Sequence, residues 1–233
     1  MKLLITGATG LVGKELVKKA LEQGMIIHYL TTHKSKTKII IGARGFYWNP
    51  SSQEIDSSCF EGVDVIVHLA GATISKRWTA AYKKIILASR VDSTRLLENA
   101  LKKTKGKNQV KQIIGASALG IYSNDFKNIV TEETEVSSNS FLERVVIDWE
   151  AASAVFKTMN IKVTTLRIGL VIAVNGGVVA AMKTPILFGL GAAFGNGSQG
   201  QSWIHIKDLV GIILFSVTTK LEGIYNAVAP NPV

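Results

Sequence analysis

Short apolar runs alternate with longer amphipathic stretches along most of the chain. The apolar runs have the length of strands, and the longer stretches carry apolar residues at helical spacing. Continuous apolar strands separated by helices are typical of a parallel sheet that is covered on both faces. We therefore predict an α/β fold with a doubly wound parallel sheet, whose ligands bind at the carboxyl ends of the strands. The expected strands are 2–6, 25–31, 63–69, 110–116 and 161–168, and the expected helices include 11–23, 79–101 and 141–159.

The glycine-rich segment 176–200 shows neither the short apolar runs of strands nor apolar residues at helical spacing. We expect it to form a small irregular region on the substrate side of the sheet. The chain then stops directly after a further strand-like run at 223–228, which suggests that a C-terminal piece is missing.

The start of the chain carries the most specific motif. The strand-like run ends at Thr6, and Gly7, Gly10 and Gly13 follow at three-residue spacing before a helix-forming run. Glycine permits a tight turn and a close approach to a phosphate, and the helix N-terminus presents N–H groups and a positive dipole end. Together these features predict a dinucleotide site. A Walker-type phosphate loop is excluded, because it needs glycine in place of Ala8 and Ser or Thr in place of Glu15.

The end of the second expected strand bears on which dinucleotide binds. An acidic residue there bonds a ribose 2′-hydroxyl, whereas cations accommodate a 2′-phosphate. The segment 28–40 has no Asp or Glu but contains Lys34, Lys36 and Lys38, and Thr31 and Thr32 can donate hydroxyl hydrogen bonds. The sequence therefore favours NADP(H) over NAD(H), with a solvated basic turn as the alternative.

Composition narrows the class of protein further. The 233 residues suit one large domain, and 47% of them are hydrophobic. The net charge of +10 allows a nucleic-acid partner, but the basic residues are scattered, so a small polyanionic ligand is the better interpretation. No apolar run is long enough to span a membrane, and no signal peptide is recognisable. The single cysteine, Cys59, suits a reducing cytoplasm, and no cluster with metal-ligand spacing occurs, so we predict a cytoplasmic protein without a metal.

Several segments together carry a family resemblance. With the glycine motif, the run 64–71, and Ser117 followed by Tyr122, the chain resembles the extended short-chain dehydrogenase/reductase superfamily. Within it, the chain is similar to the "epimerase family protein" group, on the segments 75–78, 89–90, 149–152, 166–169 and 203–208. The resemblance implies a Rossmann-like NAD(P)-binding domain over 1–233, with substrate-side elements mainly within 170–233. It also implies a short C-terminal domain beyond this chain.

The resemblance also implies a set of cofactor contacts. The pyrophosphate would be held by Gly7, Thr9, Gly10, Leu11, Val12 and Gly13. Thr31 and Thr32 fall on the adenosine ribose side, and Leu69, Ala70 and Gly71 on the adenine side. The group often has arginine where Thr32 stands, so Lys34 would have to supply the cation.

Two further positions follow from the resemblance. Arg90 stands where sugar epimerases carry asparagine, so its guanidinium could pair with a phosphate or bond the nicotinamide side. The alternative for Arg90 is a solvated helix residue. Ile172 is expected to pack near the nicotinamide ring.

The acid–base pair of the superfamily is missing. Short-chain dehydrogenases generally use a Tyr-x-x-x-Lys pair, in which the ammonium lowers the phenol pKa. None of the five tyrosines has lysine four residues later, and Phe141 and Val145 occupy the places of the pair. The usual epimerase hydroxyl falls on Ala118, with Ser117 one residue early. The catalytic residues therefore stay unassigned.

Other candidate residues leave alternatives open. His68 is expected to be structural, whereas His205 could face the substrate pocket or bond the backbone. Arg77 and Trp78 could form a flat cationic wall, or Trp78 could be core. Trp149 and Glu150 are expected to be a packing residue and a surface acid, respectively.

Two functions remain after these considerations. The first is an NADP(H)-binding epimerase or oxidoreductase acting on a small carbonyl or hydroxyl compound. The second is a non-catalytic dinucleotide-binding regulatory or scaffold protein.

Overall fold

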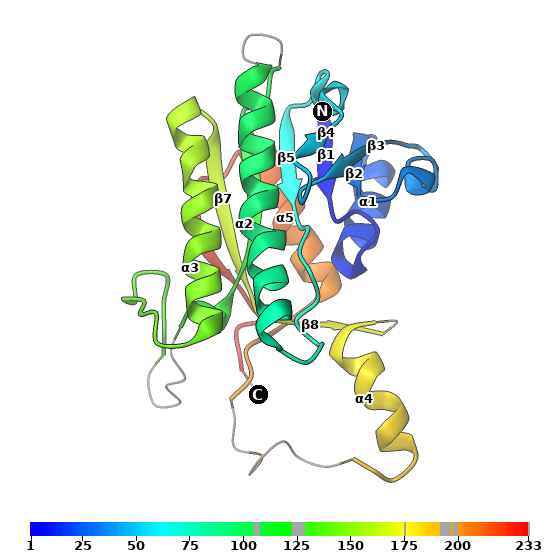
Figure 1. Cartoon of the computed structure of the whole chain (residues 1–233). Coiled ribbons are helices and arrows are strands. Elements are labelled where there is room, and N and C mark those ends of the chain that lie inside the picture. Colours follow the sequence, from blue (N-terminus) through cyan, green and yellow to red (C-terminus); the bar gives the residue numbers. More distant parts are fainter. Residues whose placement is uncertain (105–107, 123–128, 175, 192–196, 198–199, 233) are drawn as a thin grey trace.

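The computed structural model describes residues 1–104, 108–122, 129–174, 176–191, 197 and 200–232. Its centre is an eight-stranded sheet in the order β10-β7-β6-β5-β1-β2-β3-β4 (Figure 1). All neighbouring strands pair in parallel except β3 and β4, which are antiparallel. The strands are β1 (Lys2–Thr6), β2 (Ile26–Thr31), β3 (Ala43–Asn49), β4 (Glu54–Ile55), β5 (Val65–His68), β6 (Gln112–Ala118), β7 (Lys162–Ile168) and β10 (Gly223–Ala227). The predicted doubly wound α/β fold is confirmed.

The strand order reverses between β1 and β5. The chain runs outward from β1 to β3 on one side, and then returns to build β5, β6 and β7 on the other side. In open α/β sheets, ligands bind in the crevice outside the carboxyl ends of the strands at such a reversal. The turn after β1 and the turn after β5 therefore lie at the expected binding edge.

Two pairs of helices cover the two faces of the sheet (Figure 1). Helices α1 (Leu11–Glu22) and α5 (Ile206–Thr219) pack together on one face, and α2 (Ala80–Lys103) and α3 (Phe141–Ala154) pack on the other. Adjacent residues of β1 serve opposite faces, because Leu3 belongs to the core under α1 and α5, whereas Leu4 belongs to the core under α2. This alternation explains why the central residues of β1, Leu3, Leu4 and Ile5, are all apolar.

The segment after β7 builds a second, smaller layer. Strands β8 (Leu170–Ala173) and β9 (Trp203–His205) form a two-stranded parallel sheet, and α4 (Gly177–Leu187) follows β8. These elements lie beyond the carboxyl ends of the central strands, in the lower part of Figure 1. The expectation of an irregular region over 176–200 is wrong at α4. The helix is apolar around nearly its whole circumference and buries little of it, so its sequence lacks the one-sided period of a packed helix.

Element boundaries differ from the predictions by one to two residues for most strands. The predicted helix 141–159 ends as a 3₁₀ segment, η4 (Val155–Met159), and the predicted helix 79–101 begins after Thr79, whose side chain caps it, and extends to Lys103. Strands β3, β4, β8 and β9 and helix α5 were not predicted. In the part of the chain that the structure describes, no helix has the length and apolarity to cross a bilayer.

Candidate dinucleotide and substrate site

The turn between β1 and α1 is built from glycine for two geometric reasons. Gly7 has a φ of +70°, and a Cβ on it would lie 3.0 Å from the carbonyl oxygen of Leu69. A Cβ on Gly13 would lie 2.1 Å from the carbonyl oxygen of Gly7, because α1 packs directly on the turn. Both positions therefore exclude any other residue without a shift of the backbone.

The N-terminus of α1 is open to an anion. Gly10 is the N-cap residue, no side chain caps the helix, and the first turn contains no acidic residue. The first backbone N–H groups of a helix have no partner within it, and the helix dipole places partial positive charge there. Thr9, Leu11 and Val12 surround this end and are partly exposed. An arrangement of this kind can accept a phosphate group.

The turn after β5 is held against the glycine turn by Thr6. The Oγ1 atom of Thr6 accepts hydrogen bonds from the backbone N–H groups of Leu69 at 3.1 Å and Ala70 at 3.0 Å. The predicted pyrophosphate residues and the predicted adenine-side residues, Leu69, Ala70 and Gly71, therefore meet at one edge, as the reversal of strand order requires.

His68 is buried at the centre of a polar network. Its Nδ1 atom lies 2.7 Å from Thr6 Oγ1, and its Nε2 atom lies 3.1 Å from the hydroxyls of Ser93 and Thr94. Both hydroxyls donate to backbone carbonyls of α2, so Nε2 carries the proton and Nδ1 accepts from Thr6. Burial lowers the pKa of His68 to about 4, so the ring is neutral at pH 7. His68 is thus a structural residue that ties α2 to β1 and β5, as predicted.

Arg90 lies beside the turn after β5 instead of pointing into solvent. Its guanidinium stacks over the indole of Trp149, 5.1 Å from the ring centroid, and Nη1 donates to the carbonyl oxygens of Ala72 and Ile86. A Cβ on Gly71 would touch the guanidinium at 3.3 Å. Desolvation lowers the pKa of Arg90. The solvated alternative for Arg90 is therefore wrong.

The end of β2 presents hydroxyl and basic groups. Thr31 is buried and its Oγ1 accepts from the backbone N–H of His33 at 3.3 Å, while Thr32 is exposed. Thr31 pairs in register with Tyr47 of β3, and the ammonium of Lys34 lies over the Tyr47 ring, 5.0 Å from its centroid. Lys34 is therefore held at the tip of β2, where a 2′-phosphate would lie.

The connection from β8 to α4 contacts the start of α1. A Cβ on Gly176 would lie 2.6 Å from Leu11 Cδ1, which places this connection against the N-terminus of α1. Ile172 is partly buried on β8 and pairs in register with His205 of β9. The Nδ1 atom of His205 accepts a hydrogen bond from the backbone N–H of Lys207 at 3.3 Å and caps α5. Of the two roles considered for His205, the hydrogen bond to the backbone is therefore present.

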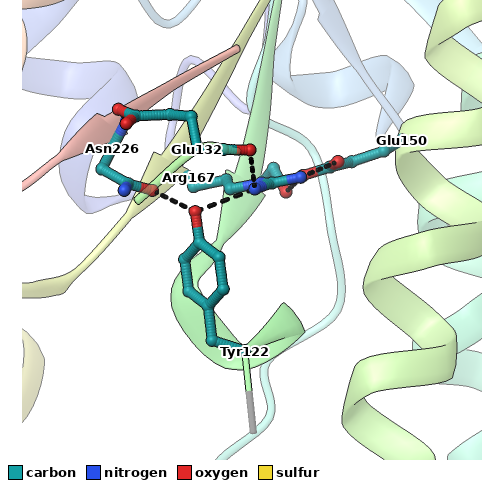
Figure 2. A network of polar contacts seen from close by, with 6 residues as sticks. Tyr122, Glu132, Glu150, Arg167 and Asn226 are labelled. Carbon is teal, nitrogen blue, oxygen red and sulfur yellow. Dashed lines mark hydrogen bonds and ion pairs between the residues drawn. The ribbon is translucent and has the colours of Figure 1, made fainter. Parts of the chain in front are cut away.

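An ion pair with little solvent exposure joins Arg167 of β7 to Glu150 of α3 (Figure 2). The guanidinium of Arg167 donates to both carboxylate oxygens of Glu150, and its Nη1 atom donates to the hydroxyl of Tyr122 at 2.8 Å. Tyr122 in turn donates to Asn226, and Ser117 donates to Glu150. The hydrogen bond to Glu150 raises the pKa of Arg167.

The prediction that Glu150 is a surface acid is wrong. Its side chain is 13% exposed and that of Arg167 is 5% exposed. Arginine inside a strand needs a partner when it is buried, so Arg167 was the signal in the sequence that could have located this pair. Trp149, the neighbour of Glu150, is buried as predicted.

The place of the superfamily tyrosine is lined by rings and cations. Phe141 begins α3, and its ring meets that of Trp78 edge to face at a centroid distance of 5.8 Å. Trp78 is 37% exposed, so the core alternative for this residue is wrong. The ammonium of Lys83 lies over the Phe141 ring, whereas Val145, in the place of the superfamily lysine, is buried. Among the described residues, no group of His, Cys, Asp and Glu side chains could hold a metal ion.

Comparisons with known proteins agree with this geometry. The NAD dependent epimerase/dehydratase family profile matches residues 3–227. An epimerase family protein of Staphylococcus saprophyticus is 36% identical over 231 residues, which cover 97% of this chain and 74% of that protein. The chain thus spans about three quarters of that relative's length.

Solved structures agree with the family match. A nucleoside-diphosphate sugar epimerase of Corynebacterium glutamicum is 33% identical with a TM-score of 0.83, and the match covers 100% of this chain and 47% of that one. The human epimerase family protein solved with NADPH is 26% identical with a TM-score of 0.80, over 99% of this chain and 75% of that one. On this evidence, the chain belongs to the NAD-dependent epimerase/dehydratase family.

Proposed function

We propose that the chain binds NADP(H) and acts as an oxidoreductase or epimerase-like protein on a small carbonyl or hydroxyl compound. The observation that carries this proposal is the uncapped, acid-free N-terminus of α1, placed against the turn after β5. The human relative solved with NADPH supports it. We also propose a cytoplasmic location, which the single cysteine, Cys59, supports.

The residues present fit a dinucleotide. The glycine turn leaves room for a diphosphate at the start of α1, because Gly7 and Gly13 let the turn pack closely on its neighbours and the N-cap residue Gly10 has no side chain. Thr9, Gly10, Leu11 and Val12 would hold the diphosphate, and Leu69, Ala70 and Gly71 would line the adenine side. Arg90 would supply a cation next to Gly71, and Ile172 would pack near the nicotinamide. The cofactor itself supplies hydride exchange, and the protein supplies binding and orientation.

The residues at the end of β2 support the choice of NADP(H) over NAD(H). Lys34 is seated on Tyr47, and the segment 28–40 contains no acid that would compete for the ribose hydroxyl. A cation at this position pairs with a 2′-phosphate. NAD(H) would lose this contact and bind more weakly.

A second candidate function is a dinucleotide-binding regulatory or scaffold protein without turnover. One observation favours it. Phe141 and Val145 have no protons to exchange, and the hydroxyl of Ser117 is bonded to Glu150. An enzyme would therefore need water, the substrate itself or another side chain for proton transfer, because losing an acid–base group costs about 10²–10⁴-fold in rate.

The test combines cofactor titration with a substrate panel. NADPH and NADH are titrated by fluorescence at matched salt, and we expect NADPH to bind at least about tenfold more tightly. Gly10→Asp should abolish binding while the fold is kept, because aspartate is a favourable N-cap that occupies the same N–H groups. Gly211→Asp, on the exposed side of α5, is the charge control.

Turnover then separates the two candidate functions. Carbonyl compounds, alcohols and nucleotide sugars are screened with NADPH and NADP⁺. Saturable turnover that Gly10→Asp removes supports the enzyme. Tight cofactor binding without any turnover supports the regulatory protein, and equal affinity for NADH and NADPH contradicts the choice of NADP(H).

A further inference from the structure

The loop after β5 and the first turns of α2 and α3 bring basic and aromatic side chains together. We name Lys76, Arg77, Trp78, Tyr82, Lys83 and Phe141 the cationic aromatic patch. It lies at the carboxyl end of β5, the same end of the sheet as the phosphate-binding start of α1. A second ligand bound beside the cofactor would meet these side chains first.

Charge is strongly segregated in this part of the chain. Residues 65–91 contain five basic residues and no acidic residue. The acid in the first turn of α3, Glu143, is 8% exposed and accepts from the backbone N–H of Ser140 at 2.8 Å, so it is committed to the capping box. Within the described residues, the ion pairs involve none of the cations of the patch.

Aromatic rings hold two of these cations in place. The ammonium of Lys83 lies 5.1 Å from the centroid of Phe141, and that of Lys76 lies 5.6 Å from the centroid of Tyr82. A ring face orients an ammonium without neutralising it, whereas a carboxylate would cancel its charge. The cations are therefore positioned and still able to bind an anion.

The rings of the patch are themselves fixed. The indole N–H of Trp78 donates to the carbonyl oxygen of Ile74, and the Tyr82 hydroxyl donates to that of Thr73, at 2.8 and 2.7 Å. The polar atoms of both rings are thus used within the loop. What they offer a ligand is apolar ring surface beside the cations.

We propose that the patch binds the substrate through an anionic group, a carboxylate or a phosphate, carried next to its carbonyl or hydroxyl carbon. Lys83 and Lys76 contact the anion, and Trp78 packs on the apolar part of the ligand. This inference rests on the proposed function, because it names the substrate class of the same site. It also explains why residues 65–91 contain five Lys and Arg residues and no acidic residue.

The experiment measures binding instead of turnover. Calorimetry is carried out on the protein with and without saturating NADP⁺, which cannot reduce the ketone probes, and the absorbance of NADPH is followed to confirm that no hydroxyl probe is oxidised. Three anionic probes are each compared with a neutral counterpart: phenylpyruvate with phenylacetone, dihydroxyacetone phosphate with dihydroxyacetone, and UDP-glucose with glucose. These arms distinguish a carboxylate, a simple phosphate ester and a nucleoside diphosphate as the source of the anion.

The expected result is saturable binding in at least one anionic arm, at least about tenfold tighter than its neutral counterpart. Lys83→Gln and Lys76→Gln should each weaken that binding about tenfold while leaving the affinity for NADP⁺ unchanged. Lys84→Gln is the matched control, because Lys84 is the adjacent lysine but lines the outer groove between α2 and α3. It should change the affinity less than twofold, as expected for an exposed charge away from the ligand.

Three outcomes would overturn the inference: equal binding of anionic and neutral probes, equal effects of Lys83→Gln and Lys84→Gln, or binding of NADP⁺ with no response to any anionic probe. Failure of the proposed function looks different. In that case NADP⁺ itself does not bind, while the anionic probes still discriminate Lys83→Gln from Lys84→Gln on the cofactor-free protein.

Discussion

Arg167 and Glu150 form a two-point ion pair that joins β7 to α3. The Nε–Oε1 and Nη2–Oε2 distances are 3.0 and 2.9 Å (Figure 2). Arg167 pairs in register with Ser117 on β6 and with Asn226 on β10, so the pair spans three neighbouring strands near their carboxyl ends. It thereby holds the strands next to the candidate substrate site in a fixed relation to α3.

Removing one partner of this pair should destabilise the fold strongly. Glu150→Gln leaves a buried guanidinium without its counter-charge, and we expect the free energy of unfolding to fall by about 3 kcal/mol. Urea unfolding measures this change. Glu22→Gln, which breaks the exposed Lys19–Glu22 pair, is the control and should cost less than about 0.5 kcal/mol. Similar losses in both variants would contradict a stabilising role for the buried pair.

Stability should fall below neutral pH because of His68. Its pKa is lowered from 6.5 to about 4 by burial, so the unfolded chain binds the proton more readily than the folded protein. The contribution of His68 is therefore complete above about pH 6.5 and is lost as the pH falls toward 4, at most about 3 kcal/mol in total. His28, whose pKa is also lowered by burial, acts in the same direction.

Urea unfolding at pH 7 and pH 5 checks this dependence. His68→Asn should show a smaller loss of stability between the two pH values, while His28 still contributes in both proteins. An unchanged pH dependence in this variant would exclude His68 as a source of the effect.

Alanine should have opposite effects at two helical glycines. Gly13→Ala places a Cβ 2.1 Å from the carbonyl oxygen of Gly7, so we expect a lower melting temperature and weaker NADPH binding. Gly211→Ala meets no atom within 4 Å on the exposed side of α5, and the higher helix propensity of alanine should stabilise the protein by up to about 1 kcal/mol. Thermal unfolding and NADPH titration measure both. Loss of stability at Gly211 equal to that at Gly13 would show that packing on the turn is not the cause.

Arg90 should contribute to cofactor affinity. Arg90→Gln removes the cation beside Gly71 and the stack on Trp149, and we expect NADPH to bind about tenfold more weakly. Arg95→Gln, five residues further along α2 and facing the outer groove, is the matched control. Calorimetry gives both dissociation constants. An unchanged affinity in Arg90→Gln would remove Arg90 from the proposed cofactor site.

Local sequence patterns were sufficient to predict the parallel sheet and the glycine turn that precedes α1. Short, mainly apolar strands such as Lys2–Thr6 indicate burial on both faces of a sheet. The spacing of Gly7, Gly10 and Gly13 predicts a turn followed by a helix. Each of these features depends on residues that are close in sequence. Helix α4 was missed for the same reason, since a helix with little buried surface leaves no one-sided pattern.

The sequence by itself determined the doubly wound sheet, the glycine turn and the absence of the Tyr-x-x-x-Lys pair. Only the tertiary structure decided that Glu150 is buried against Arg167, that Arg90 lies on Trp149, and that Lys83 lies over Phe141. The physical reason is that the burial and electrostatic environment of a charged side chain depend on the elements packed against it. Those neighbours come from other segments of the chain, so no local pattern records them.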